Sequence, residues 1–272
     1  MTELNQRFFD KPIQPLQLKA IRQEIRSGQF IHHTSGLAPG LVQANIVILP
    51  KRYAYDFLRF CVLNPKPCPL LHVSNEGDPQ INELGDKLDI RKDVPKYRVF
   101  RHGILESEVT DISSFWQNDF VIFTLGCSFS FEEALVGVGI KLRHIEQGHN
   151  ITMFKTNIPC QPSGPFKGNL VVTMRPLKPQ QAVQAVAISN RFPSVHGAPV
   201  HLGDPAAIGI EDISNPDFGD PTIVEPGEIP VFWACGVTPQ LAIMEAKPSI
   251  CITHKPGCML ITGLLNQALA IA

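Results

Sequence analysis

Apolar and polar positions alternate along this chain in a way that predicts a sequence of short helices and strands. Leu18, Ile21 and Ile25 fall on one face of a helix that Ser27-Gly28 can end. Further helices are expected over 54–62, directly after 125, from Pro179, and from Thr238-Pro239. In the helix after 125, Ser130 and Glu133 have the spacing of a capping box.

Strand patterns fill the intervals between these helices. FVIFTL (120–125) is apolar on both faces, as expected for a central strand, and YRVFRHGILESEV (97–109) is typical of a hairpin. The other expected strands are NIVIL, PLLHV, ITMFKTN, NLVVTM, APVHL, PVFWA, SICIT and CMLIT. The order of expected strands and helices changes near residue 146, and the first pattern resumes after residue 212. The sequence therefore predicts an α/β fold, with a large α/β sheet domain (1–145 and 213–272) and a smaller inserted two-layer α+β domain (146–212).

Composition narrows the class of protein without naming a function. The 272 residues are 44% hydrophobic and 18% charged, with a formal net charge of −1, which excludes a strongly basic nucleic-acid surface. The first 14 residues lack the apolar core of a secretion signal, and no stretch has the length of a membrane span. Seven cysteines without CxxC spacing indicate free thiols in a reducing compartment. We expect a cytoplasmic protein that binds a small molecule, neither nucleic acid nor membrane.

Two strand-to-helix turns carry a thiol. TLGCSFSFEEAL (124–135) contains Cys127, and PVFWACGVTPQLA (230–242) repeats the arrangement at Cys235. At a helix start a thiol is expected to have a depressed pKa and to react as thiolate. The alternative is that both cysteines are small residues packed at tight turns.

Six blocks in this order resemble the D-glutamate cyclase family, whose bacterial members are described as hydro-lyases. They are TSGLAPGLVQANIVILP (34–50), NPKPCPLLHV (64–73), LGCSFSFEEAL (125–135), RHIEQGHNITMFKTNIPC (143–160), RFPSVHGAPVHLGDP (191–205) and VFWACGVTPQ (231–240). The resemblance spans about residues 15–265. It implies an α/β fold with two subdomains and a lyase activity, the loss of water from D-glutamate to give 5-oxo-D-proline. It carries no catalytic residue assignment.

Cyclising glutamate needs a base for the α-ammonium, donors for an oxyanion, an acid for the departing hydroxyl and a site for the α-carboxylate. Histidines beside carboxylates suit the proton transfers. The expected acid–base residues are His144, Glu146, His196 and His201. The two thiol turns would hold an anion. Alternatively, Cys127 and Cys235 would act as the two bases of a racemase, or one of the two thiols would attack the γ-carboxyl as a nucleophile. A non-catalytic small-acid-binding protein is the third alternative.

The remaining candidates would bind substrate or metal. Backbone and hydroxyl donors of the two turns come from Gly126, Ser128, Gly236 and Thr238, while Arg143, Arg175 and Asn157 could hold a carboxylate. Asn45, at another strand edge, could donate a hydrogen bond or cap a turn. No metal motif is present, although His149 and Asp204 are weak candidate ligands. The sequence leaves open a divalent metal as cofactor and a homo-oligomer as assembly.

Overall fold

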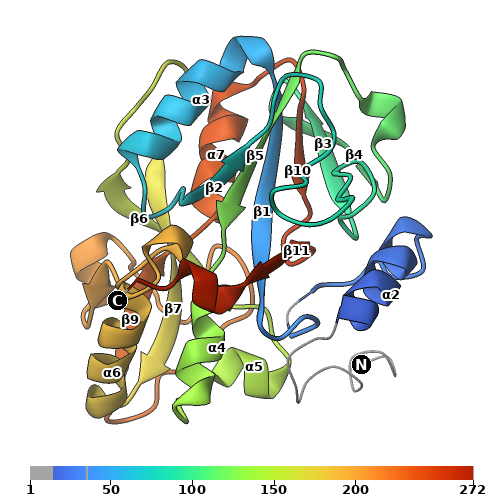
Figure 1. The fold of residues 1–272 in the computed structure, drawn as a ribbon. Helices are drawn as coiled ribbons and strands as arrows, with labels where there is room; N and C mark the ends of the chain where they lie inside the picture. The colour runs from blue at the N-terminus through green and yellow to red at the C-terminus, as the bar shows by residue number, and fades with distance from the viewer. Residues whose placement is uncertain (1–14, 35, 272) are drawn as a thin grey trace.

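The computed structural model describes residues 15–34 and 36–271, which form a mixed α/β fold on two antiparallel sheets (Figure 1). This confirms the fold class expected from the sequence. Residues 1–14, where we predicted no secretion signal, lie outside the described residues, as does residue 35 in the loop over 34–40.

The large sheet has seven strands, and β1 is at its centre. β11 (Leu260–Leu265) pairs with β1 beside the main path. Along that path the order is β2 (Leu70–Val73), β5 (Phe120–Gly126), β1 (Leu41–Pro50), β10 (Cys251–His254), β3 (Tyr97–Arg101) and β4 (Ile104–Val109).

Strand β1 is buried at every position, because both faces of the large sheet are covered. Val47 and Leu49 enter a core that also contains residues of the small sheet, such as Val172. Ile46 and Ile48 point into a second core on the opposite face. An apolar run without polar alternation is the pattern that such a doubly covered strand requires.

The small sheet has the order β6 (Met153–Pro159), β7 (Asn169–Leu177), β9 (Ile229–Ala234) and β8 (His201–Leu202). Strand β9 contains PVFWA, which we expected within the large domain. It pairs instead with β7, from Val172↔Ala234 to Leu177↔Ile229. Its apolar side chains complete both the shared core and the core beneath α4 and α6. Strand pairing is long-range, so the local pattern could not reveal it; the division into two domains stays a prediction.

Helices cover both sheets (Figure 1). α3 packs on β1 and β5, α4 on α6, and α7 on β7. The described α-helices are α2 (Pro15–Arg26), α3 (Lys51–Leu63), α4 (Phe129–Gly137), α5 (Arg143–Gln147), α6 (Pro179–Asn190) and α7 (Val237–Ala246). Short 3-10 turns are η1 (Ser113–Phe115), η2 (Pro193–Val195), η3 (Pro205–Ile208) and η4 (Asn266–Leu269).

The predicted capping box of α4 is wrong. The N-cap residue is Ser128, two positions earlier, so Ser130 and Glu133 both lie inside the helix. Glu133 instead accepts hydrogen bonds from the Gly40 N–H and the Asn266 amide, and thereby ties α4 to the start of β1 and to the C-terminal turn η4. The motif failed because this carboxylate has partners far away in the sequence.

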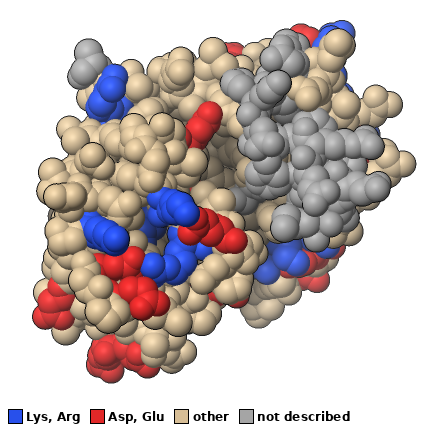
Figure 2. Space-filling view, turned by 90° about the horizontal axis from the view of Figure 1, so that it is seen from below, with Lys and Arg blue, Asp and Glu red and all other residues tan. Residues whose placement is uncertain are grey.

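Charges are mixed on the face that Figure 2 shows, where Lys and Arg side chains lie next to Asp and Glu. The pattern agrees with the nearly neutral composition. Among the described helices, none is both long enough and apolar enough to cross a membrane.

Candidate active site

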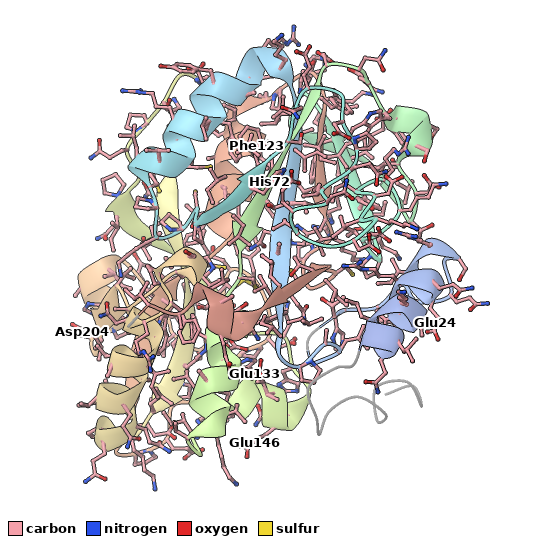
Figure 3. All side chains as sticks on the ribbon, in the orientation of Figure 1. Glu24, His72, Phe123, Glu133, Glu146 and Asp204 are labelled. Atoms are coloured by element: carbon pink, nitrogen blue, oxygen red, sulfur yellow. The ribbon has the colours of Figure 1, made fainter. Side chains whose placement is uncertain are left out.

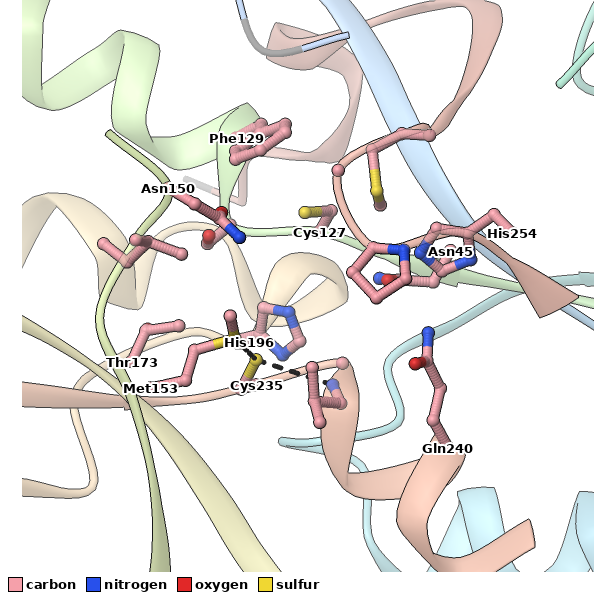
Figure 4. Close-up of a pocket in the computed structure, with 17 residues that line it drawn as sticks. Asn45, Cys127, Phe129, Asn150, Met153, Thr173, His196, Cys235, Gln240 and His254 are labelled. Carbon is pink, nitrogen blue, oxygen red and sulfur yellow. Dashed lines mark hydrogen bonds between the residues drawn. The ribbon is translucent and has the colours of Figure 1, made fainter. Parts of the chain in front are cut away.

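The two thiol turns meet at one cavity of about 60 Å³. One turn joins β5 of the large sheet to α4, and the other joins β9 of the small sheet to α7. The cavity therefore lies between the sheets, not at one edge of a single parallel sheet. Figure 4 shows the side chains around it. The turns contribute Cys127, Ser128, Phe129, Cys235, Gly236 and Val237.

Asn45 links the two turns and explains their glycines. Its Nδ2 donates a hydrogen bond of 2.9 Å to the Gly126 carbonyl. A Cβ on Gly236 would lie 2.6 Å from the same Nδ2 atom, and a Cβ on Gly126 would lie 2.1 Å from the Ser194 carbonyl oxygen. Any larger residue would force these elements apart, so both glycines are required by close approach.

Both thiols serve as hydrogen-bond acceptors at the helix starts. The Cys127 sulfur accepts from the Phe129 N–H, and the Cys235 sulfur accepts from the Val237 N–H at 3.5 Å. Burial raises the pKa of Cys127 to about 12 and that of Cys235 to about 11. The depressed pKa that we expected is therefore wrong, since desolvation of the thiolate outweighs stabilisation by the helix N-terminus.

His196 is the predicted acid–base residue that lines this cavity. It is buried, has a positive φ of 86°, and its Nδ1 lies 2.7 Å from the Lys66 carbonyl oxygen. Because a carbonyl only accepts, Nδ1 carries the hydrogen and Nε2 carries the lone pair. Burial lowers the pKa of His196 to about 4, so the ring is neutral at physiological pH.

His144 and Arg175 lie behind the cavity wall instead of in it. Arg175 is buried between Phe131 and Trp233, with its guanidinium 5.2 and 5.0 Å from the ring centroids. It hydrogen-bonds to the Glu132 carboxylate and to the hydroxyl oxygens of Ser128 (3.1 Å) and Thr173 (3.0 Å), both of which line the cavity.

Glu132 joins the two buried candidates. Its second carboxylate oxygen lies 3.5 Å from His144 Nε2. Burial alone would raise the pKa of Glu132, but Arg175 and His144 outweigh it and lower the pKa to about 2. Glu132 is therefore ionised and neutralises Arg175, which leaves this arginine without a free charge for a substrate carboxylate.

The other predicted acid–base residues, His201 and Glu146, lie outside the cavity; the first is half-buried and the second is exposed. His201 Nε2 is 2.7 Å from the Asp204 carbonyl oxygen, and the Asp204 carboxylate caps η3 through the Ala206 N–H. Glu146 is exposed and pairs with Lys141, and Figure 3 shows it and Asp204 at the periphery. None of these residues lines the cavity.

The remaining candidates have other partners. Arg143 forms two hydrogen bonds to the Glu228 carboxylate, at 2.9 and 2.7 Å. Thr238 fixes α7 to β7 by accepting from the Val171 N–H at 2.9 Å. Asn157 lines a different surface cavity. His149 is exposed, and the described residues contain no group of three or more His, Cys, Asp or Glu side chains placed to hold a metal ion.

His254 is the cavity residue that sequence reasoning missed. It ends β10 and is buried, with Nδ1 3.2 Å from the Ile46 N–H. Its signal was a polar residue closing the apolar run SICIT, just before Pro256-Gly257. Asn45 gives a similar signal within the apolar strand β1, where the sequence alone predicts a hydrogen-bond donor or a turn cap.

A larger cavity of about 460 Å³ adjoins this chamber. The two share Asn150, Met153, Val237, Gln240 and Pro256 in their linings. The outer cavity is mostly apolar, with Phe100, Leu105 and Phe218 among its residues. Its shared lining residues place it directly beside the chamber that His196, His254 and the two thiols line.

The Glu132–Arg175 pair predicts a pH-dependent loss of stability. Replacing Glu132 with Gln leaves a buried, uncompensated guanidinium and should reduce the free energy of unfolding by about 3–5 kcal/mol at neutral pH. Because the folded-state pKa of Glu132 is depressed to about 2, its contribution is present above its unfolded pKa and lost as pH falls toward 2. Urea unfolding of wild type and E132Q should therefore converge on acidification.

The matched control for E132Q is Glu146→Gln, which removes an exposed carboxylate paired only with Lys141. Its unfolding free energy should stay within about 0.5 kcal/mol of wild type. A pH-independent gap between E132Q and wild type would contradict the assigned ionisation.

The raised thiol pKa predicts slow alkylation. A shift in pKa from 9.0 to about 12 reduces the thiolate fraction of Cys127 roughly 1,000-fold near neutral pH. Iodoacetamide labelling of the Cys127 peptide, followed by mass spectrometry, should rise steadily with pH and show no plateau near pH 9. A plateau below pH 8 would instead identify a reactive thiolate.

Comparison with known proteins agrees with the sequence resemblance. A family described as D-glutamate cyclase matches residues 121–263. A protein of Verminephrobacter eiseniae named "putative hydro-lyase" is 59% identical over 251 residues, which cover 92% of each chain. Proteins of the same description from Bordetella petrii and Rhizobium johnstonii are each 58% identical over 250 residues, covering 92% of this chain and 95% and 93% of theirs.

One solved structure, a nitrogen repressor-like protein of Methanococcus jannaschii, aligns over 86% of this chain and 90% of that protein at 10% identity and a TM-score of 0.35. That likeness is too low to carry an argument. The assignment rests instead on the family match and on relatives that are almost 60% identical over nearly the whole chain. This chain belongs to the D-glutamate cyclase family.

Proposed function

We propose that this protein is a hydro-lyase that removes water from a small amino or hydroxy acid, with cyclisation of D-glutamate to 5-oxo-D-proline as the leading reaction. The observation that carries the proposal is the state of His196. It lines the cavity as a neutral ring whose Nδ1 is engaged by the Lys66 carbonyl, so Nε2 is left to accept a proton. The names of the relatives support the lyase class.

His196 would act first on the substrate nitrogen. Its Nε2 takes a proton from the α-ammonium, and the resulting amine attacks the γ-carboxyl carbon to form the new C–N bond. Holding both groups in one small chamber favours this intramolecular attack. The nitrogen loses two protons in all, and both leave with one carboxyl oxygen as water. The reaction consumes no net proton.

The helix starts would hold the negative charges of the substrate. Among the described residues, no acceptor is hydrogen-bonded to the backbone N–H of Ser128 or Gly236, and both residues line the cavity. α4 and α7 have nine and ten residues, long enough for their N-terminal N–H groups to stabilise a carboxylate. The thiols, which accept neighbouring N–H groups, help to shape these two sites.

Raised thiol pKa values argue against the racemase alternative, in which Cys127 or Cys235 must be a thiolate in the resting enzyme. Cys127→Ser keeps a cap for the Phe129 N–H and removes the sulfur, so a cyclase should retain most of its activity. A racemase would lose Cα exchange with deuterated solvent. A non-catalytic binding protein would be stabilised thermally by D-glutamate but would turn none over.

The decisive assay is the conversion of D-glutamate to 5-oxo-D-proline by the purified protein, followed by NMR with and without divalent metal. Replacing His196 with Asn should lower kcat about 100-fold or more, because it removes the proton acceptor at Nε2. Asn tolerates positive φ, and its amide can still donate to the Lys66 carbonyl, so the fold should be kept.

The control variant is His201→Asn, which alters a half-buried histidine that lies outside the cavity. It should behave as wild type. An unreactive wild-type protein under all of these conditions would eliminate D-glutamate as substrate, and equal activity in H196N would eliminate His196 as the base.

A further inference from the structure

Two histidines line the cavity, and their surroundings fix opposite tautomers. The Ile46 N–H points at His254 Nδ1 over 3.2 Å, and an N–H can only donate. Nδ1 of His254 must therefore hold the lone pair, and the hydrogen of the neutral ring is on Nε2. In His196 the Lys66 carbonyl imposes the reverse arrangement, with the hydrogen on Nδ1.

Both rings are buried, and burial is the main cause that lowers each pKa to about 4. At physiological pH each histidine is thus neutral and presents a single kind of group. Among the described residues, none is hydrogen-bonded to Nε2 of either ring. Figure 4 shows the two rings around the same cavity. One ring offers a proton acceptor there, and the other offers a hydrogen-bond donor.

We propose that His254 is a second catalytic residue, whose Nε2–H donates a hydrogen bond to the carboxyl oxygen of the substrate that becomes negative when the nitrogen attacks. The inference rests on the proposed dehydration of a small acid. As the C–N bond forms, the C=O π electrons move onto that oxygen, and the donor stabilises them.

His254 keeps its proton throughout this step. His196 takes the nitrogen protons and returns them to the departing oxygen, which leaves as water. A neutral imidazole held in one tautomer can polarise a carbonyl in this way, as in triosephosphate isomerase. Both rings return to their starting protonation states after each turnover, so the two protons lost by the nitrogen are the two that leave in water.

Hydrogen-bond geometry also explains why a histidine suits this position. The ring must accept from a buried strand N–H at one nitrogen and donate into the cavity from the other. Asn can satisfy the Ile46 N–H with its carbonyl oxygen but is too short to place a donor where Nε2 lies. Gln carries its amide nitrogen near that place. H254N therefore tests acceptance of the Ile46 hydrogen bond alone, and H254Q tests donation into the cavity.

Long-range ¹H–¹⁵N correlation NMR on the ¹⁵N-labelled protein at neutral pH identifies the two tautomers and does not depend on catalytic activity. We expect His254 as the Nε2–H form and His196 as the Nδ1–H form. Adding 5-oxo-D-proline should shift the His254 Nε2–H proton as its hydrogen bond forms. An Nδ1–H or doubly protonated His254, or a proton signal that ligand binding leaves unmoved, would overturn the proposal.

Kinetics with D-glutamate give the second arm. H254N should lower kcat about 100-fold to 1,000-fold with little change in KM, and H254Q should recover at least tenfold of that loss. A folded H254N, judged by circular dichroism and Tm, that keeps kcat within about threefold of wild type would overturn the role. If the wild type does not turn over D-glutamate, only the proposed substrate is eliminated. The tautomer measurement, which needs no ligand, still decides whether His254 presents an Nε2–H donor.

Discussion

The buried Arg175 guanidinium is the constraint on which the site depends. Leaving this charge unpaired would cost about 3–5 kcal/mol of unfolding free energy, so the neighbouring side chains must supply its counter-charge and its hydrogen-bond acceptors. It meets the Glu132 carboxylate, the hydroxyl oxygens of Ser128 and Thr173, and two aromatic rings. Because Ser128 and Thr173 also line the cavity, the inner wall is held in place by a charge that no ligand needs to touch.

The same pair connects the two sheets. Glu132 lies in α4, which continues from β5 of the large sheet, while Arg175 lies in β7 of the small sheet. Their attraction draws the start of α4 toward β7 and β9, and Asn45 of β1 packs against the turn that follows β9. The cavity forms where these two halves meet. A cavity between sheets of antiparallel strands therefore follows from the packing of charged and polar groups.

The sequence predicts correctly the features that are determined by residues close together in the chain. Helix periodicity, the apolar strand β1 and the two Gly-Cys turns depend on neighbouring residues, and the structure has them as predicted. Glu133 is not the capping-box residue that the sequence predicts, and His144 lies behind the cavity wall, because the partners of both side chains come from other parts of the chain. His254 was missed for the same reason, since the group that sets its tautomer is the backbone N–H of Ile46 in another strand. Residue type indicated possible chemistry, and long-range pairing determined which residues could perform it.

The cavity lining contains no Asp, Glu, Lys or Arg side chain among the described residues. A substrate carboxylate would therefore be held by helix N-termini and neutral donors, while the nearest buried cation, Arg175, is already compensated by Glu132. In the proposed reaction, fixed neutral dipoles around a small chamber would stabilise the developing oxyanion without binding the resting carboxylate too tightly, which is the condition for favouring the transition state. The raised pKa values of the two thiols fit this arrangement, since each cysteine shapes a helix start without adding a charge to the chamber.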